Sequence, residues 1–543
     1  MKLEYIYCEF AKEQDSHFIW SLRNDSYARK MSKNKGYINL KTHNIWFKQK
    51  INDKKYNFVI IFYKGEKVGY ARFDVSIQDQ VTYVSINILD KYRNKGIGTD
   101  GLSKAIELII QNRRDICKKF IAEVREENTV SKKLFDSLGF RLKKSMNSID
   151  RYELLYSERN KLPSLLVDIK EGIIDLGWGH PSAHLHPTEF IKEGTNQLFD
   201  RNDHIPLQYG AAQGFGPFLN SLAVFLSSQS SYYSQISPNN LFLTAGASQG
   251  IDLSCTLFTK SGDTVIVEEP TYFVVEKIFR DHGLQIVGVP IDENGIKVSE
   301  LKKILTKGLR PKFIYTIPTY QNPTGICMSV ERRNQLIELS EEFDFLILAD
   351  EVYQLIYFNN LPPPPFMSLN HHGRVISFGS FSKILAPGLR TGWIHSSSDK
   401  ISKFSDSAVT FSGGGFNHFA ATLIREVIDL GLLEKNIDII RNEYIRRCDV
   451  MNVALSKYFG DSISYSIPSG GYYYWLDFKS GFNTEIFLPH AEKAGVSYRP
   501  GKIFSESGKF ENFLRLAYTL YEPDQLEEGV SRLYTAYRNF GKS

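Results

Sequence analysis

A lysine that lies among hydroxyl groups and precedes an arginine suggests covalent chemistry. Ser380, Ser382 and Lys383 follow an apolar run at 375–378, and Arg390 comes seven residues after the lysine. The run predicts a buried strand that brings these groups to one strand end. A lysine there loses hydration, which lowers its pKa and makes the neutral amine nucleophilic. Because hydroxyl and guanidinium groups are phosphate ligands, we expect a nucleophilic lysine beside a phosphate site.

Four apolar runs upstream end in residues that suit the same site. The runs alternate with helical periodicity, which predicts a largely parallel sheet covered on both faces. Ligands of such sheets gather at the carboxyl ends of the strands, so the residues there are expected to meet around one ligand. The strand ending at 244 is followed by Ala247 and Ser248 at the start of a helix, and the strand ending at 267 is followed by Tyr272. Asn322 follows the strand ending at 316, and Asp350 and Tyr353 follow the strand ending at 349.

These residue types are the ones that pyridoxal 5'-phosphate (PLP) requires. Asp350 would keep the pyridine nitrogen protonated, and Tyr272 would stack on the ring. Asn322 and Tyr353 would hydrogen-bond the ring oxygen. Lys383 would link covalently to the cofactor and then act as base and acid at the substrate α-carbon. The predicted catalytic residues are therefore Lys383, Asp350 and Tyr272.

This ordered set resembles the fold type I, class I/II aminotransferases. It is most similar to the group that holds aminoadipate and kynurenine aminotransferases and the enzyme-like domain of MocR regulators. The resemblance covers nearly all of residues 165–538. It implies a large α/β domain, with a mostly parallel sheet between helices, followed by a small α/β domain.

The resemblance also implies the substrate and cofactor contacts. Arg515 would hold the substrate α-carboxylate, with Gly179 and Asn322 as further substrate contacts. Tyr209 would reach the PLP phosphate across the interface of a homodimer. The substrates would be an amino acid and an oxo acid. The residues expected to bind PLP are Ala247, Ser248, Tyr272, Asn322, Asp350, Tyr353, Ser380, Ser382, Lys383, Arg390 and Tyr209.

The first 157 residues are more basic than the rest of the chain and contain a second candidate anion site. They carry 30 Lys and Arg against 19 Asp and Glu, although the whole chain has a net charge of only +5. This excess suits an anionic ligand such as a nucleotide or coenzyme A, but it could equally be a solvated lysine-rich surface. A strand predicted at 81–88 leads into Arg93, Gly96 and Gly98 and then a helix. A glycine loop at a helix start binds anions.

This loop resembles the Arg-x-x-Gly-x-Gly loop of the GCN5-related N-acetyltransferase (GNAT) family, which holds the pyrophosphate of acetyl-CoA. A predicted strand at 120–124, a helix after Asn128 and the pair Gly139-Phe140 extend the resemblance over roughly residues 3–157. It implies an α/β fold with acetyl-CoA as cosubstrate. The implied acetyl-CoA contacts are Arg93, Asn94, Lys95, Gly96, Ile97, Gly98, Thr99 and Asn128.

Two features leave the acetyltransferase chemistry open. Phe135 stands where the family commonly places a tyrosine that protonates the leaving thiolate, so another residue or a water would have to do so. Glu123, Tyr83 and Tyr92 are candidates, although Glu123 is equally compatible with an ordinary strand position. Segments 22–25 and 43–47 are similar to family members that acetylate small amines or amines on nucleotide-activated sugars. His43 and Trp46 could equally be core residues, so the acceptor is not defined.

Length and composition limit the class of protein and the number of domains that the 543 residues can form. A hydrophobic content of 42% and a charged content of 23% indicate a globular protein. We predict domains at 1–157 and 158–543, with a linker over 157–167 that contains Pro163. Further predictions are a helix over 15–31, a hairpin of strands 57–63 and 68–75, and a strand over 151–156.

The sequence also indicates where the protein is expected to reside. We expect a cytoplasmic protein without leader or membrane span, because no apolar run nears the roughly 20 residues that a span needs. The cysteines are far apart in the sequence, which fits a reducing compartment and argues against a metal site. They are Cys8, Cys117, Cys255, Cys327 and Cys448.

The function that these features favour is a bifunctional enzyme. PLP-dependent transamination would occur in the second domain and acetyl-CoA-dependent N-acetylation of a small amine in the first. Other PLP chemistry on the same fold stays open: a decarboxylase, a lyase or a C–C bond-forming synthase. A PLP-dependent sensor or regulator is a further alternative, since one related group fuses this domain to DNA-binding modules. Here the acetyltransferase loop takes that place, so no nucleic-acid partner is expected.

Overall fold

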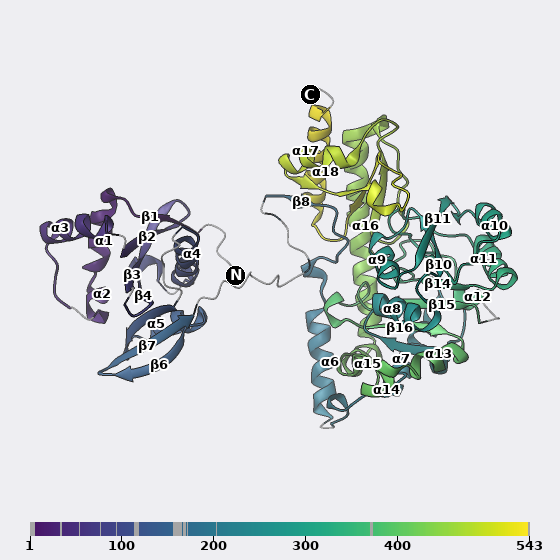
Figure 1. Cartoon of the computed structure of the whole chain (residues 1–543), viewed down its shortest axis with the longest axis horizontal. Coiled ribbons are helices and arrows are strands. Elements are labelled where there is room, and N and C mark those ends of the chain that lie inside the picture. The colour runs from purple at the N-terminus through teal and green to yellow at the C-terminus, as the bar shows by residue number, and fades with distance from the viewer. Residues whose placement is uncertain are drawn as a thin grey trace. The chain divides into compact units, whose positions relative to one another are not determined.

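The computed structural model consists of two compact units, residues 1–164 and 165–543 (Figure 1). It describes residues 6–32, 35–53, 55–76, 78–93, 95–112, 119–155, 166, 170, 172–201, 204–369 and 373–540. The predicted domain boundary after residue 157, Pro163 of the predicted linker, Asn94 and Cys117 lie outside the described residues.

The small unit alternates helices with the strands of one sheet. Its described strands are β1 (Ile6–Phe10), β2 (Tyr56–Tyr63), β3 (Glu66–Ser76), β4 (Val81–Ile88), β5 (Lys119–Arg125), β6 (Arg141–Met146) and β7 (Ile149–Leu155). Its described α-helices are α1 (Ser16–Arg23), α2 (Ser26–Met31), α3 (Leu40–Ile51), α4 (Ile97–Asn112) and α5 (Thr129–Ser137).

The sheet of the small unit has the strand order β1-β2-β3-β4-β5-β7-β6. The first four strands form an antiparallel meander. Strands β4 and β5 are parallel, but they pair only at Thr82 with Phe120 and at Tyr83 with Ile121. Both strands continue for several residues beyond these pairs and therefore separate. This opening in the middle of the sheet is where a ligand can pass.

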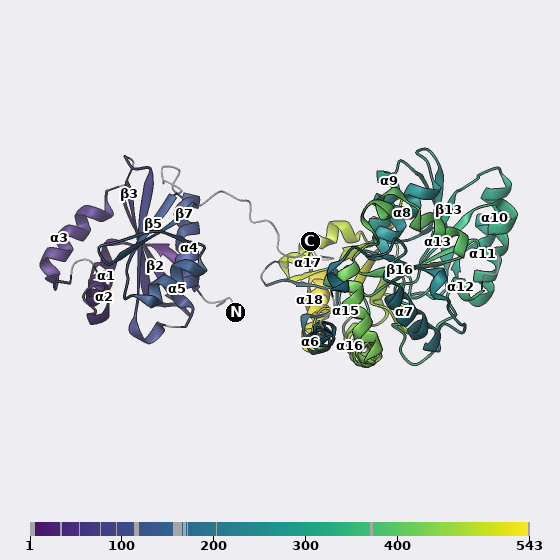
Figure 2. The same cartoon turned by 90° about the horizontal axis from the view of Figure 1, so that it is seen from below.

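Helices cover both faces of this sheet, as strand periodicity requires. Ala71 and Phe73 of β3 pack with Leu102 and Ile106 of α4 on one face. Phe58, Ile60 and Tyr70 pack with residues of α1 and α3 on the other. Figure 2 shows α1, α2 and α3 on one side of the strands and α4 and α5 on the opposite side. Because successive side chains of a strand point to opposite faces of the sheet, every second residue of β3 and β4 faces the space between the sheet and α1–α3.

The small unit confirms one local prediction and corrects another. Lys64 and Gly65, both with positive φ, form the turn of the predicted hairpin, β2–β3. The single helix predicted over 15–31 is wrong, since α1 ends at Arg23. Asp25 then caps α2 by accepting a hydrogen bond from the Ala28 amide, because a carboxylate competes with continued helix for backbone N–H groups.

The large unit contains the main sheet of the protein and two small sheets. Its described strands are β8 (Ile174–Asp175), β9 (Leu241–Thr244), β10 (Thr264–Glu269), β11 (Gln285–Asp292), β12 (Gly295–Ile296), β13 (Phe313–Thr316), β14 (Leu346–Asp350), β15 (Val375–Ser380), β16 (Gly392–Ser396), β17 (Tyr473–Asp477), β18 (Val496–Ser497), β19 (Arg499–Pro500) and β20 (Phe513–Ala517).

Helices connect many of the successive strands of the large unit (Figure 1). The described α-helices are α6 (Thr188–Asp200), α7 (Gly216–Ser228), α8 (Ala247–Phe258), α9 (Phe273–Asp281), α10 (Val298–Thr306), α11 (Val330–Phe343), α12 (Phe366–Leu369), α13 (Ser398–Ser405), α14 (Ala408–Gly413), α15 (His418–Asp429), α16 (Leu432–Phe459), α17 (Thr484–Lys493) and α18 (Pro523–Phe540).

The main sheet confirms the predicted mostly parallel arrangement. Its order is β12-β11-β10-β13-β14-β15-β16-β9. Strands β11, β10, β13, β14 and β15 are mutually parallel, whereas β16 is antiparallel to β15 and to β9. The central strands are buried along their whole length, because helices cover both faces. The smaller sheets are β17-β20-β19 and β18-β8. The chain thus has an α/β fold in both units.

None of the helices in the described part of the chain is both long enough and apolar enough to span a membrane.

Candidate active sites

The predicted site residues of the large unit gather at one edge of the main sheet. Strand β14 ends at Asp350 and strand β15 at Ser380. The parallel strands β10 and β13 end at the same edge. Lys383 lies close enough to Asp350 and Arg390 to interact with their charges, and Asp350 likewise with Tyr272. The structure therefore brings these predicted residues to one place.

Lys383 lies over two aromatic rings. Its Nζ is 4.8 Å from the ring centroid of Tyr472 and 5.6 Å from that of Tyr353, and it donates a 3.3 Å hydrogen bond to the Gly179 carbonyl. Burial lowers the pKa of the Lys383 ammonium, although Tyr473 and Asp350 oppose this. The lowered pKa increases the share of neutral amine, which is the nucleophilic form.

Asp350 has one buried oxygen that forms no hydrogen bond with the described residues, although the Val352 amide is close enough to stabilise the charged carboxyl. Its Oδ2 accepts a 2.7 Å hydrogen bond from the Tyr315 hydroxyl, while Oδ1 is buried and unpartnered. Burial raises the pKa of this carboxyl to about 6, although Tyr315 stabilises the charged form. An unpartnered buried carboxylate oxygen is costly, which indicates a place for a protonated ring nitrogen.

Arg515 and Asn322 contact each other in the middle of the site. Arg515 Nη1 donates a 2.7 Å hydrogen bond to Asn322 Oδ1, and Nη2 donates one of 2.7 Å to the Gly177 carbonyl. Its Nε is buried and without a partner in the described chain. The guanidinium stacks 4.1 Å from the ring centroid of Tyr473. A buried guanidinium with unused donor capacity is suited to a carboxylate.

Tyr473 is a site residue that the sequence interpretation missed. Its hydroxyl accepts a 3.3 Å hydrogen bond from the Tyr353 hydroxyl, and a Cβ added to Gly179 would lie only 2.0 Å from its oxygen. Burial opposes ionisation of Tyr473, but the charges of Arg515 and Lys383 outweigh it and lower the pKa. Its place after Gly471, at the start of β17, was the available signal. Gly179 has to be a glycine because the phenol occupies the space of a side chain.

The predicted phosphate ligands surround the first turn of α8. The helix begins at Ala247, after Gly246 with φ +94°. A Cβ at Gly246 would lie 2.9 Å from Arg390 Nη2, and Ser380 Oγ accepts a hydrogen bond from the Ser382 amide. A helix start beside a guanidinium binds phosphate well. Tyr209 is 88% exposed, so it does not reach this corner from its own chain.

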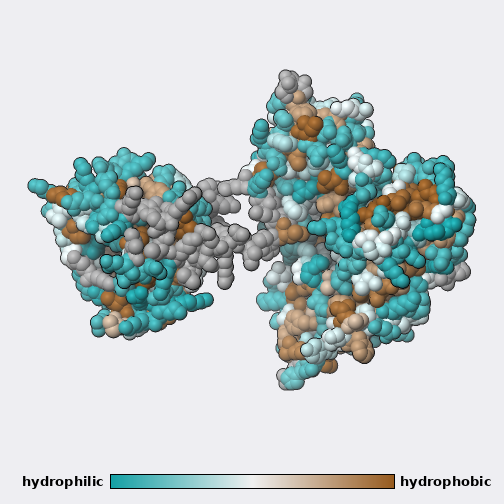
Figure 3. Space-filling model, in the orientation of Figure 1, coloured by the Kyte–Doolittle hydropathy of each residue, from teal (hydrophilic) through white to brown (hydrophobic). Residues whose placement is uncertain are grey.

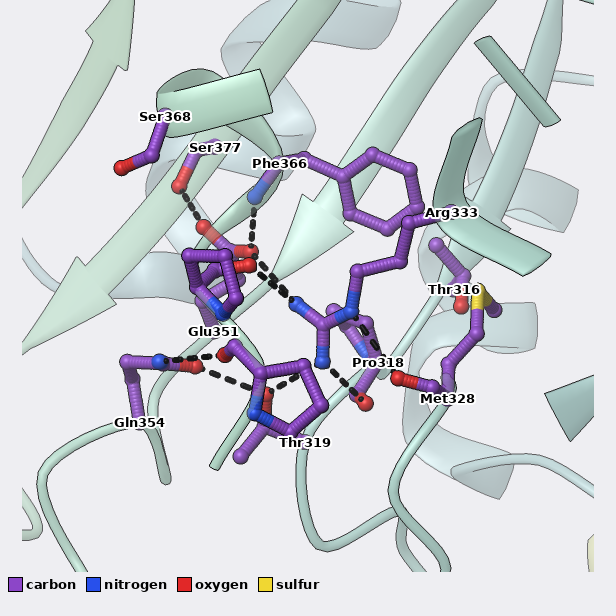
Figure 4. A network of polar contacts seen from close by, with 12 residues as sticks. Thr316, Pro318, Thr319, Met328, Arg333, Glu351, Gln354, Phe366, Ser368 and Ser377 are labelled. Atoms are coloured by element: carbon purple, nitrogen blue, oxygen red, sulfur yellow. Dashed lines mark hydrogen bonds and ion pairs between the residues drawn. The ribbon is translucent and has the colours of Figure 1, made fainter. Parts of the chain in front are cut away.

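A buried arginine links the loops that carry the site residues (Figure 4). Arg333 of α11 donates to the carbonyl groups of Met328 (3.0 Å) and Pro318 (2.8 Å) and to Thr319 Oγ1 (3.0 Å). Its Nη1 lies 3.8 Å from Glu351 Oε1. Thr319 in turn donates a 2.7 Å hydrogen bond to Gln354.

This group, which we call the Arg333 network, consists of Arg333, Thr319, Glu351 and Gln354. Glu351 follows Asp350 and Gln354 follows Tyr353 in the sequence, and Thr319 belongs to the loop that leads to Asn322. The network therefore fixes the backbone beside three predicted cofactor ligands. Sequence interpretation missed it because its members are scattered over three segments.

In the small unit, the predicted acetyl-CoA loop lies at the start of α4, as expected. Gly96 has φ +78° and α4 begins at Ile97. Arg93 donates to the Ile88 carbonyl (3.0 Å) and forms ion pairs with Asp25 (2.7 Å) and Asp90 (3.0 Å). Lys95 is exposed, while Gly98 and Thr99 line a cavity. Asn128 caps α5 by accepting a hydrogen bond from the Ser131 amide.

That cavity, of about 1030 Å³, passes through the opening between β4 and β5. It is lined by Gly98 and Phe135 from one side of the sheet and by Trp46 and Tyr70 from the other. Phe135 is buried against Phe140, with ring centroids 5.0 Å apart. Of the three proton-donor candidates, Tyr83 and Glu123 line the cavity, whereas the Tyr92 hydroxyl donates to Glu66 at 2.6 Å.

Comparison with known families agrees with both geometries. Residues 171–533 match the model of aminotransferase class I and II, which is more than half of the chain. The chain belongs to the class I and II aminotransferases. Residues 17–140 match the acetyltransferase (GNAT) family. The aminotransferase family uses PLP, and GNAT domains use acetyl-CoA.

Individual relatives cover the aminotransferase unit. The chain is 32% identical, over 70% of its own length and 94% of the relative's, to aromatic-amino-acid aminotransferase 1 of Thermococcus litoralis. It is 28% identical to 2-aminoadipate transaminase of Thermus thermophilus, over 68% of this chain and 91% of that protein. The kynurenine aminotransferase structure of Pyrococcus horikoshii matches with a TM-score of 0.64 and 33% identity, covering 68% of this chain and 92% of that one.

The aminotransferase site fits its cofactor in three respects. Asp350 Oδ1 forms no hydrogen bond with the described residues, the start of α8 faces Arg390, and the amine of Lys383 lies close to both.

Glu268 is a further buried acid near the site. It accepts hydrogen bonds from the Ile317 amide (3.1 Å) and from Gln321 Nε2 (3.2 Å), and Gln321 precedes Asn322 in the sequence. Burial raises the pKa of Glu268 to about 7. The sequence analysis missed Glu268 because a glutamate at a strand end is not distinctive.

Proposed function

We propose that the chain is a bifunctional enzyme in which the large unit transaminates an amino acid and the small unit acetylates a small amine with acetyl-CoA. Aminotransferase activity follows from the family, and the observation that supports the assignment of residues is the unpartnered Asp350 oxygen near Lys383. The observation that supports acetyl transfer is the cavity that runs from the α4 loop through the sheet.

In the proposed aminotransferase mechanism each residue has one task. PLP, when bound, supplies a ring that withdraws electrons from the substrate α-carbon. Asp350 Oδ1 would accept a hydrogen bond from the ring nitrogen and keep that nitrogen protonated. Lys383 Nζ would take up and return the proton of the substrate α-carbon, since its lowered pKa allows it to act as a base. Arg515 holds the α-carboxylate.

The remaining site residues orient the reacting groups. When PLP is bound, Asn322 and Tyr353 would hydrogen-bond the ring oxygen, and Tyr272 would stack on the ring. Burial raises the pKa of the Tyr353 hydroxyl well above the usual value, so it keeps its single proton, which it donates to Tyr473 in this structure and would have to turn toward the ring oxygen when PLP is bound. Tyr473 holds Tyr353 and Arg515 in place through its hydroxyl and its ring.

We further propose that the amino donor is an aromatic amino acid or a long acidic amino acid, as the names of the relatives suggest. The test is conversion of bound PLP to its amine form when single amino acids are added to the purified protein. Spectral change with phenylalanine, tyrosine, kynurenine or 2-aminoadipate supports the proposal. If all four are inert while alanine or aspartate reacts, the substrate assignment fails.

We propose a homodimer as the working form of the large unit. Tyr209, predicted to bind the phosphate, is almost fully exposed and therefore needs a second copy to act. Ile205 and Leu207, which precede it in the chain, are exposed, and so are Phe411 of α14 and Phe419 of α15. Figure 3 shows hydrophobic surface over α14 and α15, and such patches commonly mark interfaces. Light scattering of the holoenzyme tests this, since a monomeric active enzyme would contradict it.

For the small unit, the test is acetyl transfer itself. Purified full-length protein is incubated with acetyl-CoA and a panel of primary amines, and acetylated products are measured by mass spectrometry. Product that requires both acetyl-CoA and an amine supports the proposal. Acetyl-CoA binding without any acetylated product across the panel would indicate a binding module instead of an enzyme.

A further inference from the structure

The cavity of the small unit has a polar floor that the acetyl-CoA motif does not include. Tyr70, Arg72 and Asp74 alternate along β3, and the register pairs them with Asn87, Ser85 and Tyr83 of β4. All six line the cavity. Because strand side chains alternate between faces, these six lie on the face toward α1–α3, opposite the core against α4. They are therefore placed where an acetyl acceptor would lie.

Within this floor Arg72 is fixed in one orientation. It donates two hydrogen bonds to Asp74, from Nε to Oδ1 (2.7 Å) and from Nη2 to Oδ2 (2.6 Å). Its guanidinium also lies 5.2 Å from the Trp46 ring centroid and 5.5 Å from that of Tyr56. The bidentate contact compensates the charge of Asp74, so this carboxylate does not offer an uncompensated negative charge to an ammonium group.

The remaining charges of the cavity are mostly positive. Apart from the pairs of Arg72 with Asp74 and of Arg93 with Asp25 and Asp90, its lining includes Arg23, Arg125 and Lys133, with Glu123 as the remaining acid. Arg23, at the end of α1, lies close to the polar floor. Burial raises the pKa of Tyr70, and the charges of Arg23 and Arg72 both act against this rise. An excess of positive charge in a partly enclosed cavity attracts anions.

We propose that the acetyl acceptor is a primary amine that also carries an acidic group, a carboxylate or a phosphate, which lies against Arg23 beside the Arg72–Asp74 pair. This inference rests on the proposed acetyltransferase function and names its substrate class. The amine lies near Tyr70 and Asn87, whose side chains are hydrogen-bonded to each other at 3.1 Å. His43, whose pKa burial lowers, also lines the cavity.

The transfer step balances without any further reactant. The neutral amine nitrogen attacks the thioester carbonyl, so that the C–N bond forms and the C–S bond breaks. The amine gives up one proton and the leaving thiolate takes one. An amine that also bears a carboxylate is what transamination of an oxo acid produces, so the aminotransferase unit generates molecules of this class.

The experiment compares matched amines with and without the acidic group, using full-length holoenzyme and acetyl-CoA. L-phenylalanine is paired with 2-phenylethylamine, and glucosamine 6-phosphate with glucosamine. We expect kcat/KM to be at least about 10-fold higher for the acid-bearing member of one pair, because a site built for a charged group rejects the analogue that lacks it. The pair that responds tells whether the group is a carboxylate or a phosphate.

Arg23→Gln should remove this preference by raising KM for the acid-bearing amine while KM for acetyl-CoA stays unchanged. Arg23→Lys, which keeps the charge, should restore part of it. Arg141→Gln is the matched control, since Arg141 is an exposed arginine of β6 outside the cavity. Equal or faster acetylation of the acid-free amines overturns the inference alone. The absence of any acetylated product overturns the proposed acetyltransferase function and the inference with it.

Discussion

The two sites differ in how their side chains are held. In the aminotransferase unit, Asp350 and Asn322 are buried, and the Arg333 network fixes the loops beside them. In the acetyltransferase unit, the candidate residues line an open cavity, and Arg93 of the motif is paired with Asp25 and Asp90. The site of the large unit is held in place by buried contacts. The site of the small unit is an open cavity in which charged side chains such as Arg93 form ion pairs near the surface.

This difference suggests that single substitutions act differently in the two units. Where each group is buried and has one partner, its removal leaves an uncompensated charge or donor and therefore costs much. Where groups are partly solvated, water can replace a lost partner and the cost is smaller. Large effects are thus expected in the large unit and modest ones in the small unit.

The largest effect is expected for Lys383→Ala. Transaminase activity should fall by at least about 10³-fold, because the variant lacks both the nucleophile and the base. The visible absorption of the covalently bound cofactor should disappear, while acetyl-CoA binding by the small unit is unchanged. Steady-state kinetics and absorption spectra measure this, with exposed Lys435→Ala as the control. Retained transaminase activity would remove Lys383 from its assigned role.

Asp350→Asn should lower transaminase activity by about 10²-fold or more, since an amide cannot keep the ring nitrogen protonated. The same variant should make the cofactor-free protein more stable at pH 7. Burial raises the pKa of Asp350 to about 6. In the unfolded chain this group ionises near pH 4, so the stability of the folded state decreases as pH rises from about 4 to about 6.

Thermal unfolding of the two apoproteins across pH tests this second effect. The asparagine variant should melt at a higher temperature above pH 6, and the difference should vanish below pH 4. A difference that is independent of pH would mean that the carboxyl of Asp350 is not the titrating group.

Arg333→Met should destabilise the large unit by about 3 kcal/mol or more, because it removes the positive charge beside buried Glu351 and takes a donor from the carbonyls of Met328, Pro318 and Pro364. PLP should bind more weakly, since the loops of Asn322 and Tyr353 lose their common anchor. Denaturant unfolding and PLP titration measure the two effects. Arg374→Met, which breaks the exposed pair with Asp344, is the matched control and should change stability by less than about 1 kcal/mol. If Arg333→Met and Arg374→Met destabilised the protein equally, the burial of Arg333 would not explain its contribution to stability.

The smallest effect is expected for Phe135→Tyr in the small unit. The added hydroxyl places a proton donor where the GNAT family commonly has one, and we expect acetylation to change by less than about 10-fold. Phe135 is buried, so a slight loss of stability should accompany the change. Product formation with a good acceptor measures it. A much larger gain would show that the missing phenol limits this site.

The candidate residues of the large site could be placed at one sheet edge from the sequence, because they follow apolar strands, whereas Tyr473 and the Arg333 network could not. Asp350 comes directly after such a run, and Lys383 comes soon after another. The small site was less readable, since Tyr70, Arg72 and Asp74 become neighbours of Asn87 and Tyr83 only through strand register. Register between strands is set by pairing in three dimensions, which single-sequence patterns do not contain.

Two elements of the small unit show other limits. Strand β6 was not predicted because its side chains are all exposed and carry no apolar alternation. The helix predicted over 15–31 was interrupted by Asp25, whose side chain forms a cap and an ion pair with Arg93. Local propensity favoured one helix, but a charged contact with a residue far along the chain favoured a break there.

The Arg333 network is made of protein groups alone, so none of its hydrogen bonds depends on the cofactor. We therefore expect the loops beside Asn322 and Tyr353 to rearrange little when PLP binds, so that binding costs little backbone freedom. Amide hydrogen exchange around Thr319 and Gln354 should then differ little between protein with and without PLP, and the rate of association should be limited by diffusion and by formation of the covalent link to Lys383.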